Sequence, residues 1–406
     1  MGLAMIVNPF LNLRINNDEG AVKAITVSAP VKGDSLKVTK VDRDHDPELF
    51  GFLIIYIHAG AKGAHIVNNL TDSERDRLTT VGFLVRNDQV SSPVYFSCDF
   101  YDVHSDLLPL RAQQRSRSSV GHDDLVVNPS FHRLANNEIT PQMRKLKIAS
   151  PFPADRSWFS IDDVLSAPVF YSYAAEAIET VDLLSVGKPA PKQLSPEIRQ
   201  NLIETDVLQF QSEIGARGET RKRARDAAHR SLVERRYAIL REIIQPVQLA
   251  AIRRYYRDLI REGFVQFGDS EWPNRFFSGL DGLAYFFQRQ LTPVISEIVG
   301  EKVQPTFNYF ASYRPGSDLK AHRDRKQCRY AMSVLLDHDH AADLSSYPLY
   351  LQPPGAPEAV PINASLGDGV LYFGEEVLHY RATLAKGYST HWFVHWVPES
   401  FEGSLD

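Results

Sequence analysis

The strongest constraint on the fold of this chain is a pair of β-patterned stretches near its carboxyl end, each carrying a histidine. The first is Tyr313–Asp324, in which a Pro-Gly turn precedes a short run that ends in His322, Arg323 and Asp324. The second is Gly369–Arg381, in which apolar residues follow a Gly-Asp-Gly turn and lead to His379. Because a strand projects alternate side chains to one face, His322 and Asp324 can present an imidazole and a carboxylate to the same point. The two stretches therefore predict strands that meet at a shared polar site.

His322, Asp324 and His379 are metal ligands by residue type. Two histidines and one carboxylate with open coordination positions are the donor set of non-haem Fe(II) oxygenases. A His-x-Asp tripeptide alone is weak support, because the chain contains 13 His and 50 Asp plus Glu residues and surface polar pairs are common. The surroundings favour the metal, since apolar strand patterns follow at Cys328–Asp337 and Pro348–Leu351. These three residues are our candidate catalytic and metal-binding residues.

The order of these stretches resembles the prolyl-4-hydroxylase-like branch of the Fe(II)/2-oxoglutarate-dependent dioxygenases. The resemblance covers Ile243–Pro398 and is strongest in His322–Cys328 and in His379-Tyr380-Arg381. It implies an α+β fold with a double-stranded β-helix core, of the jelly-roll or cupin-like kind, buttressed by helices. It also implies that His322, Asp324 and His379 bind Fe(II), with 2-oxoglutarate as cosubstrate and O2 as oxidant.

The far carboxylate of 2-oxoglutarate then needs a partner. Fe(II), one carboxylate ligand and a dianionic cosubstrate sum to a net negative charge, and a low-dielectric pocket penalises such a charge. A guanidinium is the best match, because its planar fork pairs both carboxylate oxygens. Arg381 lies two residues beyond His379, and hence on the same face of a continuing strand.

The sequence departs here from the common family pattern, in which a Lys or Arg lies further along the chain after the distal histidine. The corresponding stretch, Gly387–Trp396, contains neither residue type. Three candidates for the cosubstrate carboxylate remain, namely Arg381, His391 and His395. Tyr313 is a candidate hydroxyl donor by its family position, although a core tyrosine beside a turn is an equally good interpretation.

The resemblance implies that 2-oxoglutarate is converted to succinate and carbon dioxide while a substrate C–H bond is hydroxylated. Asp324 supports hydroxylation, desaturation or ring closure, since related halogenases have a small residue in place of this carboxylate. The substrate class stays open among amino acids, peptides, protein side chains and related metabolites. Two alternatives also stay open: a cupin-like metalloenzyme that does not use 2-oxoglutarate, and a catalytically silent binding module.

Composition limits the remaining function classes. The chain has 406 residues, 43% hydrophobic content and a net charge of −5, which predicts a sizeable core and more than one domain. Such a balance gives no reason to expect nucleic acid or a membrane as partner, and no stretch predicts a membrane span, an export signal or a lipid anchor. Its two cysteines, Cys98 and Cys328, cannot form a disulfide framework and fit a cytoplasmic protein. The oligomeric state is left open.

We expect three regions along the chain. Residues 1–190 form a mixed α/β domain or extension that is a candidate for substrate recognition. Residues 191–242 contain a linker and a charged helix, and residues 243–406 form the oxygenase domain. The stretch Val186–Lys192, with two prolines, is the clearest linker. The basic segment Glu219–Arg236 is better explained as a solvated helix than as a nucleic-acid surface, because apolar positions are interleaved and no aromatic stacking platform accompanies it.

Local patterns predict several further elements. Strands are expected at Val22–Val31 and Leu49–His58, and Thr71 with Glu74 forms a capping box for a helix over Asp72–Val81. The remaining expected helices are a short one capped at Ser160–Asp163, one at Ala174–Leu184, one beginning at Ser195 and two amphipathic ones at Gln245–Gly263 and Asp281–Val299. Arg275 falls between the last two helices, in a predicted loop, where a surface arginine is the commoner case.

Overall fold

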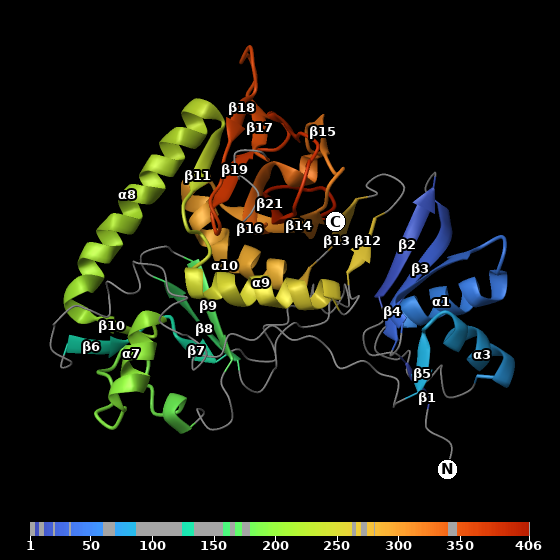
Figure 1. Ribbon diagram of the computed structural model, residues 1–406, viewed down its shortest axis with the longest axis horizontal. Helices are drawn as coiled ribbons and strands as arrows, with labels where there is room; N and C mark the ends of the chain where they lie inside the picture. Colours follow the sequence, from blue (N-terminus) through green and yellow to red (C-terminus); the bar gives the residue numbers. More distant parts are fainter. Residues whose placement is uncertain are drawn as a thin grey trace. The chain divides into compact units, whose positions relative to one another are not determined.

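The structure of the chain is a computed structural model (Figure 1). It describes residues 5–7, 12–18, 21–31, 34–59, 70–86, 124–133, 157–162, 167–172, 179–261, 265–268, 274–279, 281–339 and 347–405. The chain divides into two compact units. The first contains Met1–Val94 with Arg144–Ala149 and Arg257–Gln266, and the second contains Tyr95–Met143, Ser150–Tyr256 and Phe267–Asp406.

The described part of the first unit combines antiparallel strands with helices around an apolar core. Its elements are β1 (Met5–Val7) paired with β5 (Leu84–Arg86), the sheet β2 (Asn12–Asp18), β3 (Ala21–Val31) and β4 (Asp34–Asp42), and the helices α1 (Pro47–Ala59) and α3 (Asp72–Thr80). Ile25, Val27, Leu53 and Phe83 are fully buried in its core. The mixed α and β character expected for the N-terminal region is confirmed.

One predicted strand of this unit is wrong. The segment Leu49–His58 forms most of helix α1. Asp46 supports the helix start, because its carboxylate accepts a hydrogen bond from the Leu49 amide at 3.1 Å and Pro47 occupies the first turn. The run Leu53–Ile57 is continuously apolar, and such a run has no periodicity that separates a buried strand from a buried helix.

Helix α3 follows its prediction closely. The Thr71 side chain accepts from the Glu74 amide, and the Glu74 carboxylate accepts from the Thr71 amide at 2.7 Å. The capping box is therefore confirmed. Strand β3 likewise confirms the strand predicted at Val22–Val31.

The described residues of the second unit begin with two small sheets and a helix. Its elements are β6 (Leu125–Val127) paired with β10 (Leu208–Phe210), the sheet β7 (His132–Arg133), β8 (Ser157–Asp162) and β9 (Ala167–Ser172), and helix α7 (Pro196–Glu204). Helix α7 confirms the prediction at Ser195. The helix predicted at Ser160–Asp163 is wrong, because Ser160 pairs with Val169 inside the β8–β9 hairpin. Only residues 179–184 of the helix predicted at Ala174–Leu184 are described, and 179–181 are helical.

The stretch predicted as a linker is hydrogen-bonded to β6. The amides of Gly187 and Ala190 donate to Val127 and Leu125 at 3.0 and 2.8 Å. The cluster that includes Leu125 and Val127 also contains residues from both sides of position 190, among them Val181 and Leu208. The chain is thus held in place here by backbone pairing, although its composition is typical of a linker.

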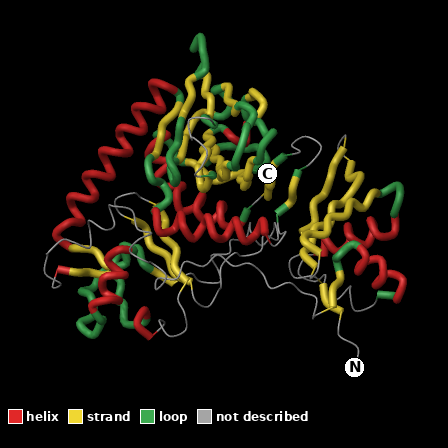
Figure 2. Tube along the Cα trace, in the orientation of Figure 1, coloured by secondary structure: helices red, strands yellow, loops and turns green. Residues whose placement is uncertain are grey.

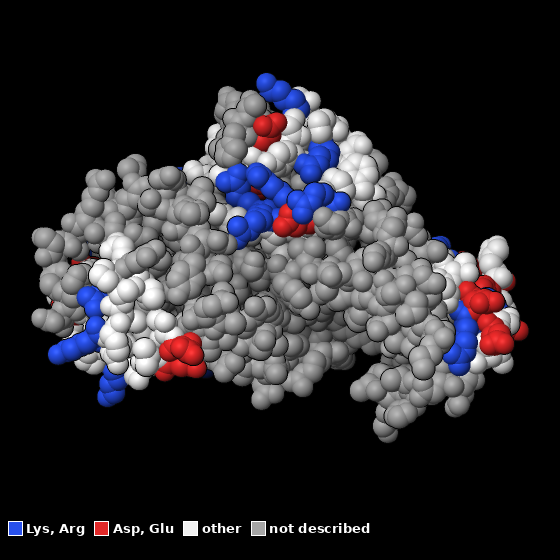
Figure 3. Space-filling view, turned by 60° about the horizontal axis from the view of Figure 1, so that its bottom comes forward, with Lys and Arg blue, Asp and Glu red and all other residues white. Residues whose placement is uncertain are grey.

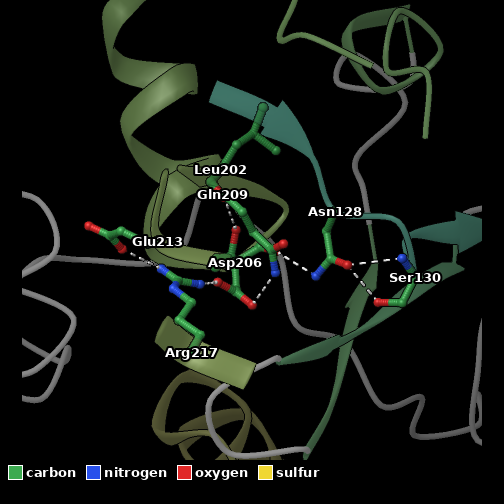
Figure 4. Close-up of polar contacts among 8 residues, drawn as sticks. Asn128, Ser130, Leu202, Asp206, Gln209, Glu213 and Arg217 are labelled. Atoms are coloured by element: carbon green, nitrogen blue, oxygen red, sulfur yellow. Dashed lines mark hydrogen bonds and ion pairs between the residues drawn. The ribbon is translucent and has the colours of Figure 1, made fainter. Parts of the chain in front are cut away.

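Buried polar residues join this part to the next helix (Figure 4). Asp206 is completely buried and has a left-handed φ of 62°. Its carboxylate accepts from Arg217 at 2.6 Å and from Gln209 at 2.9 Å, while its carbonyl accepts from Asn128 at 3.0 Å. The charged groups of Asp206 and Arg217 therefore compensate each other inside the protein.

Three longer helices follow in the second half of the chain. They are α8 (Gln211–Arg235), α9 (Pro246–Arg261) and α10 (Gly282–Val299), in agreement with the predicted helices. Asp281 caps α10 by accepting from the Ala284 amide at 2.8 Å, and Gly300 ends it with a φ of 81° that favours glycine. None of the described helices combines the length and apolar character that a membrane span requires.

Helix α8 carries many basic side chains but is not uniformly positive. Arg225 forms an ion pair with Glu297 of α10, and Arg217 also pairs with Glu213. Figure 3 shows that acidic side chains lie among the Lys and Arg side chains that gather on one face of the molecule. The described basic surface is therefore mixed in sign.

Two antiparallel sheets build the core of the C-terminal part (Figure 2). The larger sheet has the order β11 (Tyr237–Leu240), β19 (Gly369–Phe373), β16 (Tyr330–His338), β21 (Ser389–Pro398), β14 (Val303–Tyr313), β13 (Arg275–Gly279) and β12 (Gln266–Phe267). The smaller sheet has the order β15 (Leu319–His322), β20 (Leu378–Arg381), β17 (Leu349–Gln352) and β18 (Val360–Ile362). Apolar residues of both sheets share one core cluster, which includes Ala331, Leu349, Leu351 and Tyr372. The predicted double-stranded β-helix is confirmed.

Helix α10 supports the larger sheet from outside. Gln288 donates to the His395 carbonyl at 2.6 Å and accepts from the Asn308 side chain at 3.1 Å, and all three residues are buried. Trp396 of β21 donates to Thr292 at 3.0 Å. These contacts fix the backbones of β14 and β21, so their opposite faces are presented rigidly to the interior of the barrel.

Candidate metal centre

The predicted ligand residues come together on the smaller sheet. His322 ends β15 and lies directly opposite His379 of β20 in the strand register. Asp324 follows two residues after His322, and its Oδ1 lies 3.5 Å from Nε2 of each histidine. One donor atom from each of the three residues lies within 4.8 Å of the others. Among the described residues, this is the group with metal-ligand geometry.

The orientation of both imidazoles leaves one nitrogen free for a metal. Nδ1 of His322 lies 2.7 Å from the Lys320 carbonyl, and Nδ1 of His379 lies 3.0 Å from the Val377 carbonyl. A carbonyl can only accept, so each Nδ1 carries a proton, and each Nε2 is turned toward Asp324 and is the nitrogen that a metal would bind. Such backbone acceptors are the usual means of fixing the tautomer of metal-binding histidines.

Asp324 is held by its backbone and has an unsatisfied oxygen. Its amide donates to the Gly374 carbonyl at 2.8 Å. Its Oδ2 is buried and has no hydrogen-bond partner among the described residues. Burial by itself raises the pKa of this carboxyl, but hydrogen bonds from His322 and His379 outweigh burial and hold the pKa well below its usual range. The carboxylate is therefore ionised, and a divalent cation would satisfy its buried oxygen.

Gly374 makes this arrangement possible. A Cβ atom at this position would lie 2.5 Å from Oδ2 of Asp324 and would also collide with the Cys328 carbonyl. Real Cβ atoms do not approach that closely, so only glycine allows the β19–β20 connection to pass so near the carboxylate. The sequence pattern gave no sign of this role, because Gly374 follows an apolar strand like many turn glycines.

Arg381 lies further along β20 and is buried, with 5% of its surface exposed. It donates to the Tyr347 carbonyl at 3.1 Å and to Ser333 at 3.2 Å, and its Nη2 lies 3.4 Å from Nδ1 of His391. Its Nε has no partner among the described residues. A cavity adjoins the guanidinium and is lined by Arg381, Ser333, Tyr347, His391 and Leu384, among others.

The two other candidate histidines differ in their charge. Burial, together with the positive charge of Arg381, holds the pKa of His391 well below its ordinary value, so this imidazole is neutral. Burial also opposes charging of His395, but Cys328 and Asp324 outweigh it and raise the pKa of His395 to about 9. His391 therefore lies beside Arg381 without adding positive charge, whereas His395 belongs to the surroundings of Asp324.

Two tyrosines present unsatisfied hydroxyl groups to the same interior. Tyr313 is completely buried, and its ring centroid lies 5.7 Å from that of Tyr347 and 5.9 Å from that of His391. Neither Tyr313 Oη nor Tyr347 Oη has a hydrogen-bond partner among the described residues. Tyr347 and Ser333 were missed in the sequence. Tyr347 adjoins the strand pattern at Pro348–Leu351, and Ser333 lies within the one at Cys328–Asp337. Nothing in either pattern distinguished the two residues from core residues.

Arg275 is not a surface residue in a loop. It is the first residue of β13, pairs with Tyr313 in the strand register, and has 8% of its surface exposed. The prediction was wrong because the segment is short and follows a Trp-Pro-Asn sequence that is typical of a turn. Cys98 lies outside the described residues, and Cys328 is a buried free cysteine.

Comparisons with known proteins locate the similarity in the C-terminal part. No protein-family model matches the chain, and no curated protein matches it. A Pseudomonas putida prolyl-4-hydroxylase is similar over 43% of this chain and 100% of its own, with 13% identity and a TM-score of 0.37. A Trichoplax adhaerens prolyl hydroxylase, solved with a hypoxia-inducible-factor peptide, covers 45% of this chain and 92% of its own, with 12% identity and a TM-score of 0.39.

A third similar structure has a different described activity. It is SnoN, a non-haem α-ketoglutarate-dependent epimerase of nogalamycin biosynthesis, with 9% identity, a TM-score of 0.37 and coverage of 44% of this chain and 83% of its own. Each of the three structures matches less than half of this chain.

Proposed function

We propose that the C-terminal part of the chain is an Fe(II)- and 2-oxoglutarate-dependent oxygenase. The observation that carries the proposal is the cluster of His322, Asp324 and His379, in which a buried carboxylate oxygen has no partner among the described residues. A buried guanidinium on the same strand as His379 supports it. This combination provides both a site for a divalent metal and a counter-charge for an acidic cosubstrate.

The residues present fit Fe(II) with 2-oxoglutarate. Nε2 of His322, Nε2 of His379 and the Asp324 carboxylate would hold the metal, which leaves coordination positions for cosubstrate and oxygen. When bound, iron and 2-oxoglutarate supply the oxidising chemistry, with O2 consumed and succinate and carbon dioxide released. The protein contributes a fixed ligand geometry through the two carbonyl-bonded imidazoles.

Arg381 is our candidate for the far carboxylate of 2-oxoglutarate. It lies two residues beyond His379 on β20, so its Cα is about 6.5 Å further along the strand and its side chain is on the same face. His391 is neutral, and its Nδ1 contact helps to hold the guanidinium. The unsatisfied hydroxyl of Tyr313 is positioned in the same interior to donate a further hydrogen bond.

The reaction we propose is hydroxylation of an unactivated C–H bond in an amino acid, a peptide or a related metabolite. Asp324 supports this choice, because its carboxylate would occupy a coordination position that related halogenases leave open for halide. We further propose that the N-terminal half takes part in substrate recognition, since its described residues include a separate apolar core and none of the candidate metal ligands.

The test uses the full-length protein. Calorimetry should detect tight binding of a divalent metal and, after it, of 2-oxoglutarate, and oxygen uptake should accompany succinate formation. Metal binding without any effect of 2-oxoglutarate would indicate the other cupin-like class of metalloenzyme. Failure to bind a metal at all would indicate a catalytically silent binding module.

A further inference from the structure

Three exposed basic side chains flank the metal cluster, on the segment that contains Asp324. They are Arg323, Arg325 and Lys326, and we call them the basic rim. The cluster is accessible to solvent on this segment, since the His322 side chain has 40% of its surface exposed. Positive charge is therefore concentrated where the described part of the metal site meets solvent.

The two arginines of the basic rim contact different parts of the barrel. Nε of Arg323 donates to the Glu376 carbonyl at 3.0 Å, in the connection between β19 and β20. Cζ of Arg325 lies 5.1 Å from the ring centroid of Phe307, which belongs to β14. That ring also lies near His395, with the two ring centroids 6.1 Å apart. The basic rim therefore extends from the β19–β20 connection to β14.

These contacts leave donor atoms of both guanidiniums for a ligand. Arg323 donates to the carbonyl through Nε, and Arg325 meets Phe307 in a cation–π contact, which needs no N–H donor. The Nη atoms at the ends of the two side chains can therefore pair with carboxylates, for which a guanidinium has matching geometry.

The charges of the basic rim are not compensated within the described part of the chain. No described residue forms an ion pair with any of its three members. Acidic side chains of the neighbouring segments are paired with other cations. Asp318 pairs with Lys320 at 2.5 Å, and Glu376 pairs with Arg236 at 3.6 Å. A surface with an excess of one charge concentrates ligands of the opposite sign, so the basic rim attracts anions to the metal site.

The spread of these charges favours an extended ligand. One exposed ion pair changes affinity by about fivefold at most, so selective binding requires several anionic groups acting together. Because Arg323 and Arg325 are anchored on different segments, carboxylates spaced along a chain match them better than one compact anion. Clusters of arginines recognise acidic peptide motifs in this way.

We infer that the basic rim binds acidic residues of a peptide substrate, beside the position at which the metal site oxidises that peptide. The inference rests on the proposed oxygenase function, because it names the substrate class of that site. 2-Oxoglutarate is also an anion, but its candidate partner Arg381 is buried on β20, with 5% of its surface exposed. The basic rim is exposed and is therefore accessible to a larger ligand.

The first part of the test measures peptide selectivity on full-length protein loaded with Zn(II) and 2-oxoglutarate. The probes are an acetylated and amidated peptide of alternating glutamate and alanine, and the same peptide with glutamine in place of glutamate, followed by ligand-observed magnetic resonance. Wild type should bind the glutamate peptide about tenfold or more tightly, and added salt should reduce this preference. Equal binding of the two peptides overturns the inference. Displacement of the glutamate peptide by equimolar inorganic phosphate at matched ionic strength also overturns it, because the site would then suit one compact anion.

The second part compares two triple glutamine variants that remove the same charge. The variant of the basic rim should bind both peptides equally. The control variant carries Lys222→Gln, Arg223→Gln and Arg230→Gln on α8, which are exposed residues of the same types. Arg223 is matched to Arg323 in its contact as well, since its Nε donates to the Glu219 carbonyl at 3.4 Å. The control should keep the preference, and an equal loss in both variants would indicate an effect of net charge and overturn the inference.

Calorimetry of metal and 2-oxoglutarate binding separates this inference from the proposed function. The triple variant of the basic rim should keep the wild-type affinity for 2-oxoglutarate, and a loss of that affinity would assign the basic rim to the cosubstrate and overturn the inference. Absence of metal or 2-oxoglutarate binding in wild type would overturn the proposed function itself. If the triple variant binds no metal because Arg323 has lost its contact with Glu376, Arg325→Gln with Lys326→Gln decides the matter. An undiminished peptide preference in that double variant overturns the inference.

Discussion

The cores of the first unit and of the C-terminal barrel differ in what they bury. In the described residues of the first unit, every buried side chain is apolar, as with Ile25 and Phe83. The barrel buries Asp324 Oδ2, Tyr313 Oη and Arg381 Nε without partners among the described residues. Leaving a buried polar atom unsatisfied costs about 1–3 kcal/mol, so such atoms are retained where a ligand satisfies them. The difference identifies the barrel as the ligand-binding part.

Burial of charge alone is not enough to mark a binding site. Asp206 and Arg217 are buried as deeply as the residues of the barrel interior, but they form an ion pair at 2.6 Å and extend it to Gln209 and Asn128. Their contacts are made within the chain. The pairing of the buried charges therefore distinguishes this structural network from the metal cluster, where Oδ2 of Asp324 has no partner among the described residues, and the following experiments test the distinction.

The largest effect is expected from removal of a metal ligand. Asp324→Ala and His379→Ala should abolish stoichiometric metal binding and lower turnover by well over 100-fold, because changes in the groups behind the ligands alone cost about 10–100-fold. Metal analysis and succinate formation measure both effects. His229→Ala is the control, since the His229 Nδ1 also bonds a carbonyl, that of Ile298 at 2.7 Å, but the residue lies outside the cluster. Near-normal metal content in either ligand variant would break the assignment.

A large effect on stability, without an effect on the site, is expected at Arg217. Arg217→Ala leaves the Asp206 carboxylate buried without its ion-pair partner, which should lower the free energy of unfolding by about 3–5 kcal/mol. Denaturant unfolding measures the loss. Replacing both residues, as in Asp206→Leu with Arg217→Met, should recover much of it, because an apolar pair leaves no buried charge. Unchanged metal affinity in these variants would sharpen the distinction between the two kinds of buried charge.

Loss of Arg381, the candidate partner of the far cosubstrate carboxylate, should weaken 2-oxoglutarate binding rather than lower stability. Arg381→Ala should weaken the binding of 2-oxoglutarate by about 2–5 kcal/mol, which raises its dissociation constant roughly thirtyfold or more. Metal affinity should change little. Because the pKa of His391 is held well below its ordinary value, this residue is neutral and cosubstrate affinity at saturating metal should not fall as the pH rises through about 6.5. A decline in that range would assign the role to a histidinium with an ordinary pKa, and a decline near pH 9 would assign it to His395, whose pKa is raised to about 9.

A smaller effect is expected from one added methyl group. In Gly374→Ala the new Cβ would meet Oδ2 of Asp324 and the Cys328 carbonyl, and the backbone must shift. Overpacking of this kind typically costs about 1–3 kcal/mol of stability, and the displaced carboxylate should also bind metal less tightly. Gly355→Ala is the matched control, since nothing lies within 4 Å of a Cβ there and its φ of 80° carries only the backbone strain of a surface turn. Equal metal affinity in the two variants would show that Asp324 tolerates the displacement.

The sequence predicted the metal cluster better than its surroundings, for physical reasons. His322 and Asp324 are two residues apart at the end of β15, so their juxtaposition follows from the two-residue period of an extended chain. The contacts of Arg275 and Tyr347 depend on which strands become neighbours across the barrel, and local patterns do not encode this. The same holds for the buried partners of Asp206, since Arg217 and Asn128 approach it from different elements.

Errors in the predicted elements have a related origin. Capping signals are local, so α3 was predicted with its cap at Thr71, and α10 was predicted over Asp281–Val299. The run Leu53–Ile57 has no polar positions to reveal its period, and it was assigned to a strand although it is helical. The stretch Val186–Lys192 has the composition of a linker but is paired with β6. The domain boundary near residue 190 stays a prediction.

The smallest effect is expected in the first unit, at the capping box of α3. The Thr71 hydroxyl accepts from the Glu74 amide at 3.3 Å, and removal of an N-cap side chain typically costs about 1 kcal/mol. Thr71→Ala should therefore speed hydrogen exchange in the α3 backbone by about fivefold, with no change in metal or 2-oxoglutarate binding. Thr80→Ala is the matched control, because the Thr80 hydroxyl bonds the Asp76 carbonyl and alanine is the better helix former. If Thr71→Ala altered cosubstrate affinity while Thr80→Ala did not, the first unit would be coupled to the metal centre, and its apolar core could no longer be regarded as purely structural.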